Sequence, residues 1–115
     1  MEGSRRRKLE AELQRALAEL VSREVKDPGV GNVTITAVDV APDLSLARVL
    51  FIPFASSHAP HEVGAGLARA SGFLRGEVAR RLRLRRAPRL EFVFDDSFDK
   101  ARRLSSLIDA ANREP

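Results

Sequence analysis

The sequence contains no cysteine, no tryptophan and no tyrosine, and six phenylalanines are its only aromatic residues. The absence of cysteine excludes disulfide bonds, thiolate metal sites and a cysteine nucleophile. The scarcity of aromatic side chains limits any surface that binds nucleic-acid bases by stacking. The longest uncharged apolar run, Val49 to Ala55, is far shorter than a membrane span. The N-terminal segment lacks the apolar core of a secretory signal, so we expect a cytoplasmic protein without a membrane partner.

Positive charge is abundant and unevenly distributed. The chain has 20 basic and 16 acidic residues, and the segment from Arg69 to Arg89 holds eight arginines but a single acid, Glu77. A second basic run extends from Arg5 to Lys8. Arginine matches phosphate geometry, and concentrated positive charge is typical of proteins that bind nucleic acid. A general compositional bias toward arginine is the alternative, but it does not explain the clustering.

The apolar spacing predicts an α+β fold in a single domain, residues 1–115 with a core over about 5–110. We expect helices over 5–26, from about 63 to 70, over 74–82 and from 97 onward, and strands over 33–40, 46–54 and 90–95. The first two strands are joined by a short turn and should form an antiparallel hairpin. The predicted order is α-β-β-α-α-β-α, with a three-stranded sheet and the helices packed on it.

A Ser-Gly pair, Ser71 and Gly72, lies between the second and third predicted helices. Glycine inside a helix costs about 1 kcal/mol relative to alanine, so it needs a reason. One interpretation is a kink that exposes backbone N–H groups, where Gly72 lets a nucleic-acid backbone approach closely. The alternative is an uninterrupted helix whose glycine makes a tight packing contact.

Several short motifs, in order, resemble one known family. They are Lys26-Asp27-Pro28, Val33-Thr34-Ile35 with Val38, Asp43-Leu44 with Ala47-Arg48-Val49, Ala70-Ser71-Gly72-Phe73-Leu74-Arg75, Leu84-Arg85, Pro88 with Leu90 and Phe92, and Asp95-Asp96-Ser97. The element order is similar to the type II KH fold, with Ala70-Ser71-Gly72 in place of the usual G-x-x-G loop. Together these features resemble the ribosome-binding factor A family. Ala101 stands where that family often has glycine, and the chain ends at Pro115 without the long polar tail of some members.

The resemblance implies a non-enzymatic protein that binds the immature small (30S) ribosomal subunit and assists late processing of 16S rRNA, notably in the cold. No cofactor, metal or small-molecule substrate is implied, and we expect a monomer. A general single-stranded RNA-binding KH module and a protein–protein adaptor are the alternative functions. We expect a helix kink at Ala70, Ser71 and Gly72. The predicted RNA-binding residues are Ser71, Gly72, Arg75, Arg80, Arg81, Arg83, Arg86, Arg5, Arg6, Arg7 and Lys8.

Three further features have structural interpretations. His58 and His61 lie in a loop with Pro60 between them, which argues against a metal site. Asp95-Asp96-Ser97 precedes the last helix, where acidic and hydroxyl side chains cap free N–H groups. Arg85 is expected to pair with Glu91 or Asp95.

Overall fold

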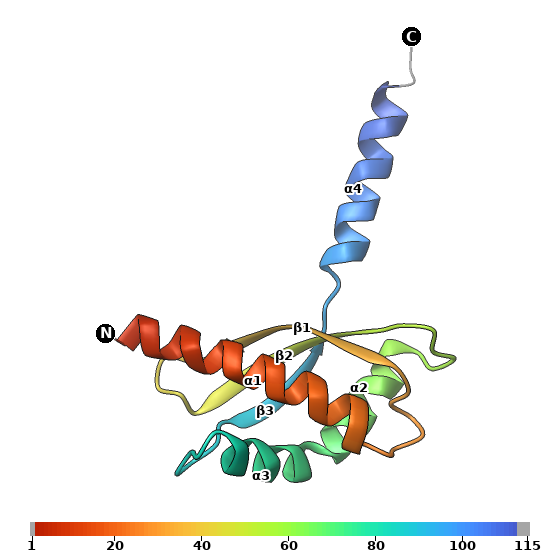
Figure 1. Cartoon of the computed structure of the whole chain (residues 1–115). Helices are drawn as coiled ribbons and strands as arrows, with labels where there is room; N and C mark the ends of the chain where they lie inside the picture. Colours follow the sequence, from red (N-terminus) through yellow and green to blue (C-terminus); the bar gives the residue numbers. More distant parts are fainter. Residues whose placement is uncertain (1, 113–115) are drawn as a thin grey trace.

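The computed structural model describes residues 2–112, and its elements follow the predicted order (Figure 1). They are α1 (Glu2–Glu24), β1 (Val33–Val40), β2 (Leu46–Pro53), α2 (Pro60–Arg69), α3 (Ser71–Arg81), β3 (Arg89–Phe94) and α4 (Ser97–Asn112). The predicted α+β class with a three-stranded sheet is therefore confirmed. The boundaries of the elements shift slightly; the second strand, for example, ends at Pro53 rather than one residue later.

The sheet has the order β1-β2-β3, with β2 in the centre. β1 and β2 form the predicted antiparallel hairpin. Its turn is closed by hydrogen bonds from Ala41 N–H to the Leu46 carbonyl and from Leu44 N–H to the Ala41 carbonyl, with Leu44 at φ 63°. β3 lies parallel to β2, because α2 and α3 carry the chain back to the starting end of β2.

The core lies between one face of the sheet and the helices α1, α2 and α3 (Figure 1). Its fully buried side chains include Leu13, Leu17 and Leu20 of α1, Val49 and Phe51 of β2, Leu67 of α2, and Leu74 and Val78 of α3. Along β2 these buried positions alternate with more exposed ones, as expected of a sheet with one covered face. No polar side chain is buried in the described part of the chain, so apolar packing dominates the core.

Side chains of helix α1 also form hydrogen bonds with backbone groups on the outer edge of β1. The N–H of Val40 donates to Glu10 Oε2 at 2.8 Å, and Gln14 Nε2 donates to the carbonyl of Thr36 at 3.2 Å. An uncovered strand edge offers unpaired N–H and C=O groups to other chains. The side chains of α1 therefore protect this edge while its apolar stripe fills the core.

Helix α4 extends away from the sheet, so the prediction that every helix packs on the sheet is wrong for α4 (Figure 1). Leu104 and Ile108 on this helix are 60% and 53% exposed. The reason lies in the short connection: only two residues separate Phe94 from Ser97, and the covered face of the sheet is already occupied. None of the described helices is long and apolar enough to cross a membrane.

Candidate nucleic-acid interface

The chain kinks at a single residue between α2 and α3. Ala70 (φ −87°, ψ −2°) ends α2 and begins α3. Its N–H donates to the carbonyls of Gly66 and Leu67, while its own carbonyl accepts from Leu74 N–H at 2.9 Å. The methyl side chain of Ala70 cannot cap α3, so the first turn of that helix keeps backbone N–H groups without a side-chain cap.

Gly72 lies on an open surface in this first turn. A Cβ atom built on Gly72 would meet nothing within 4 Å. The alternative of an uninterrupted helix with a tight packing contact at Gly72 is therefore wrong on both counts. Next to Gly72, Phe73 is 48% exposed. Packing within the fold therefore does not explain why a glycine, which lowers helix stability, stands at position 72.

A clamp between α2 and the loop that joins α1 to β1 fixes the position of the kink. Arg69 donates through Nε and Nη2 to the two carboxylate oxygens of Asp27, at 2.8 and 3.1 Å. Gly29 N–H donates to the same carboxylate at 2.9 Å. The bond from Arg69 and that from Gly29 lower the pKa of Asp27 to about 2, and Asp27 raises the pKa of Arg69.

The clamp works together with close packing at Gly66. A Cβ on Gly66 would lie 2.7 Å from Cγ2 of Val30, a residue that is only 1% exposed. The loop after α1 is thus held against the last turn of α2. The Asp27–Arg69 pair was not predicted from the sequence, where the only local signal is the Asp-Pro-Gly turn.

The predicted arginines of α3 already have partners within the protein. Arg75 donates twice to the carbonyl of Ala87, at 3.0 and 2.8 Å, and so ties α3 to the following loop. Arg80 pairs with Glu77 one turn earlier. The third, Arg81, reaches Glu19 on α1 at 3.4 Å. Of these contacts, only Arg81–Glu19 joins two helices, α3 and α1. All three arginines are exposed enough to exchange partners.

The arginines of the loop from α3 to β3 are different. Arg83, Arg85 and Arg86 are exposed, and none of them forms an ion pair or side-chain hydrogen bond with another described residue. The expected partners of Arg85 are occupied elsewhere: Glu91 lies 3.6 Å from Arg48, and Asp95 accepts from Thr36 and Ser97. The expectation that Arg85 pairs with one of these acids is wrong.

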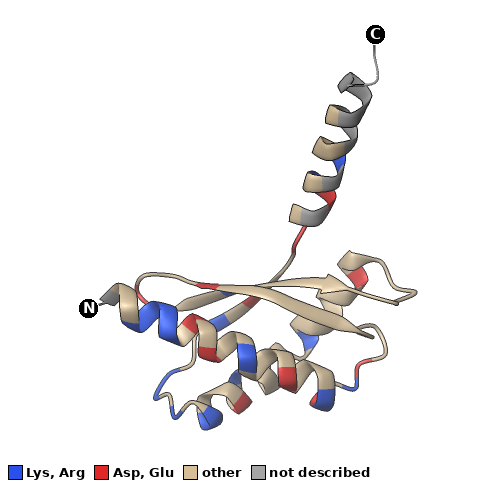
Figure 2. Cartoon of the chain, turned by 45° about the horizontal axis from the view of Figure 1, so that its top comes forward, with Lys and Arg blue, Asp and Glu red and all other residues tan. Residues whose placement is uncertain are grey.

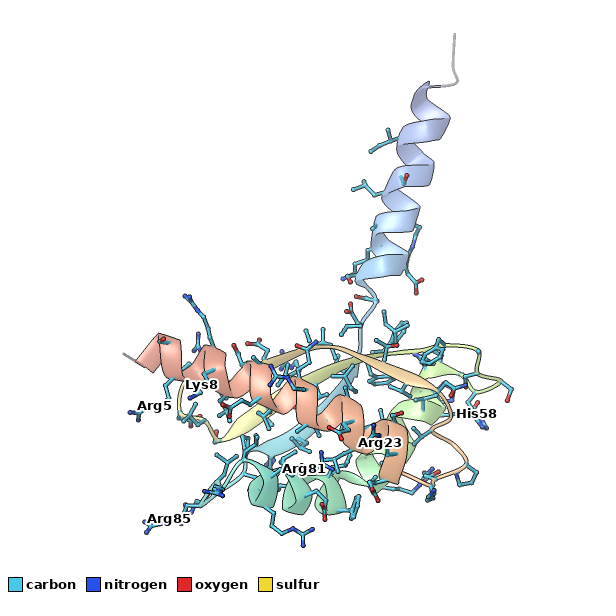
Figure 3. The ribbon with its side chains drawn as sticks, viewed as in Figure 1. Arg5, Lys8, Arg23, His58, Arg81 and Arg85 are labelled. Atoms are coloured by element: carbon cyan, nitrogen blue, oxygen red, sulfur yellow. The ribbon has the colours of Figure 1, made fainter. Side chains whose placement is uncertain are left out.

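The basic residues at the start of α1 lie at the same end of the molecule as this loop. Figure 3 shows Arg5 and Lys8 above Arg85, with Arg23 far along α1, and Figure 2 shows basic residues on both elements there. Arg7 is exposed like Arg5, Arg6 is half-buried, and Lys8 lies 4.0 Å from Glu12. We call Arg5, Arg7, Arg83, Arg85 and Arg86 the basic end.

The predicted RNA-binding residues therefore fall into two regions. Ser71 and Gly72 lie at the kink, with the Ser71 hydroxyl donating to the Ala68 carbonyl at 2.7 Å. The basic end lies beyond the other end of α3, a helix of 11 residues and so about 16 Å long. Clustering in the sequence suggests one continuous surface, but residues that are close in the chain are separated here by the length of a helix.

The remaining motifs have local roles. Asp95 Oδ1 accepts from the N–H and the hydroxyl of Ser97, at 3.0 and 2.6 Å, which confirms the predicted capping at the start of α4. These bonds and the Thr36 hydroxyl lower the pKa of Asp95. His58 lies 3.3 Å from Glu62. Among the residues whose placement is described, no three His, Asp or Glu side chains gather as a metal site.

Comparison with known proteins shows which family the chain resembles. The family model described as "Ribosome-binding factor A" matches residues 5–108. Proteins of that name from Azoarcus sp. (strain BH72) and Thioalkalivibrio sulfidiphilus are 45% and 47% identical to the chain. The alignments cover 98% and 96% of the chain, and 90% and 86% of the relatives.

Solved structures give the same result. The crystal structure of ribosome-binding factor A from Thermus thermophilus is 37% identical, with a TM-score of 0.69 over 77% of this chain and 93% of that one. A homology model of the Thermus thermophilus factor, fitted into a cryo-electron microscopy map of a 30S complex with that factor, has a TM-score of 0.66 at 37% identity, with the same coverage. The chain belongs to the ribosome-binding factor A family.

Proposed function

We propose that this protein binds the immature small ribosomal subunit and assists late processing of 16S rRNA. The support is its family membership together with the cations of the basic end, which have no acidic partner among the described residues. The Thermus thermophilus relative fitted into a map of a 30S complex supports the choice of the small subunit. The protein acts by binding rather than by chemistry, as a cytoplasmic monomer with a single KH-like RNA-binding domain, and its role is greatest in the cold.

The basic end provides most of the affinity. Five arginines without acidic partners in the described chain release counterions from up to five phosphates, and each contact contributes about 0.7 to 0.9 to the salt slope. Affinity should therefore fall roughly 100- to 500-fold between 50 and 200 mM salt. Arg6 and Lys8 add to this charge. The paired arginines Arg75, Arg80 and Arg81 contribute less, because their internal partners must first be displaced.

The kink provides close approach and orientation. Open space over Gly72 and the uncapped first turn of α3 suit a phosphate group of the RNA backbone. Ser71 and Ala70 shape the turn from which this contact is made. Two contact regions about one helix length apart favour a shaped rRNA surface over a short unstructured strand.

Co-sedimentation with immature and mature small subunits tests the proposal. Arg83→Ala with Arg86→Ala should weaken binding to the immature particle about tenfold or more and lower the salt slope by about 1.4 to 1.8. The matched control, Lys100→Ala with Arg103→Ala, removes the same charge from α4 and should bind like the unmodified protein.

Other outcomes point to other functions. Equal binding to any single-stranded RNA would indicate a general RNA-binding module. Salt-insensitive binding that both double variants retain would indicate a protein–protein adaptor. Absence of binding to either particle by the folded protein would overturn the proposal.

A further inference from the structure

A cavity lies where the start of α1 meets the turn end of the β1–β2 hairpin. It has a volume of about 210 Å³ and is lined by Arg6 of α1, Asp39 of β1, Arg48 and Leu46 of β2, and the turn at 40–42. We call it the edge pocket. It is separate from the kink, and Glu10 anchors α1 beside it by accepting from Val40 N–H at 2.8 Å. The wall formed by α1 is thus fixed before any ligand binds.

Arg6, which lines this pocket, carries an unsatisfied donor. Its Nε is buried and has no hydrogen-bond partner in the described part of the chain. Buried polar groups are nearly always hydrogen-bonded, so a donor without a partner needs an explanation. A ligand in the pocket that supplies an acceptor, such as a phosphate oxygen, satisfies this donor once the Arg6 side chain turns Nε toward it.

Asp39 and Arg48 stand directly opposite each other across β1 and β2. Both are exposed, and neither forms an ion pair with the other within the described chain. Arg48 has a loose contact with Glu91 at 3.6 Å, and its side chain is 53% exposed. The pocket therefore combines two guanidinium groups with one carboxylate that has no donor bound to it among the described residues.

This combination matches a ribonucleotide better than a bare anion. A bare phosphate has no group for Asp39 and would be repelled by it. A ribose phosphate offers both chemistries, because its phosphate accepts from arginine and its 2′-hydroxyl donates to a carboxylate. DNA lacks that hydroxyl, so Asp39 would gain nothing from it.

We infer that the edge pocket binds one ribose-phosphate unit of RNA, with Arg6 and Arg48 on the phosphate and Asp39 accepting from the 2′-hydroxyl. The inference rests on the proposed RNA binding and adds a site that discriminates RNA from DNA. The anionic partner is a nucleotide within an RNA chain rather than free phosphate, and the test separates these two sources.

The test compares oligouridylate with oligodeoxyuridylate of the same length, in fluorescence anisotropy at low salt. The unmodified protein should bind the RNA oligomer more tightly. Asp39→Ala should lower the ratio of RNA to DNA affinity about tenfold, the worth of a hydrogen bond to a charged group. If Asp39 merely repels phosphate, this variant instead strengthens binding to both oligomers equally and leaves the ratio unchanged.

Two further variants complete the test. Arg48→Ala should weaken binding to both oligomers and lower the salt slope by about 0.7, whereas Arg103→Ala on α4 should change neither. All three substituted residues are exposed, so the variants should fold, which thermal melting checks. Inorganic phosphate at millimolar concentration should compete only weakly.

The inference fails on any of three results. These are equal affinity of the unmodified protein for the two oligomers, no binding to either, or an unchanged ratio in Asp39→Ala. Such failure leaves the proposed function standing if the protein still co-sediments with immature subunits. Loss of that co-sedimentation in the unmodified protein would overturn both.

Discussion

Replacement of Gly72 by alanine should stabilise the fold and weaken RNA binding at the same time. The stability gain follows from helix propensity, since alanine exceeds glycine by about 1 kcal/mol in a helix interior. Gly72 is the second residue of α3, so about half of that gain is expected there. No clash offsets it, because a Cβ at this position meets nothing within 4 Å.

The same Cβ would stand where we propose that an RNA phosphate approaches the first turn of α3. Displacing a close contact by one methyl group costs about 1–3 kcal/mol, which corresponds to roughly 5- to 150-fold in affinity. Thermal melting should show a rise of about 2 °C. Co-sedimentation with immature subunits should show the loss of affinity.

Gly76→Ala is the matched control, because Gly76 also lies in α3 and its Cβ also meets nothing within 4 Å. It should raise the melting temperature by about 4 °C and leave binding unchanged. A Gly72→Ala variant that is more stable and binds normally would refute the proposed role of the kink. A variant that is less stable would refute the structural argument itself.

Three further predictions concern the supports of the kink and the basic end. Gly66→Ala should destabilise the fold by about 1 kcal/mol in chemical denaturation, since a clash with buried Val30 exceeds the gain in helix propensity. Asp27→Asn should lower the melting temperature at neutral pH. Because folding depresses the pKa of Asp27 to about 2, its contribution is complete above the ordinary value near 3.8 and is lost as pH falls toward 2, so the two melting curves should converge there. Arg75→Ala should lower the free energy of unfolding by about 1 kcal/mol, because the Ala87 carbonyl loses both of its donors. It should also speed hydrogen exchange in the loop from α3 to β3.

Much of the fold was predictable because its determinants are local. The apolar spacing of α1, the β-branched run of β1 and the short hairpin turn each act over a few residues. Asp95 and Ser97 cap α4 within two residues of each other, so that contact was also predictable. The break between α2 and α3 followed from a glycine in an otherwise helical pattern.

The candidate site was less predictable because its charges find partners far along the chain. Arg81 pairs with Glu19, and Arg69 pairs with Asp27, 42 residues earlier. Sequence clustering therefore could not separate the paired arginines of α3 from Arg83 and Arg85, which have no partner in the part of the chain that the structure describes. Solvent exposure does not distinguish the two groups of arginines either, because what separates them is whether an acidic side chain or a carbonyl lies within hydrogen-bonding distance.

The sequence by itself determined the elements, their order, the family and the excess of positive charge, since these depend on residue identity and short spacing. Only the tertiary structure decided the direction of α4, the division of the arginines between α3 and the basic end, and the edge pocket. The pocket is the clearest case, because Arg6, Asp39 and Arg48 lie on three different elements. They meet only because α1 packs along the edge of β1 and the hairpin sets Asp39 opposite Arg48.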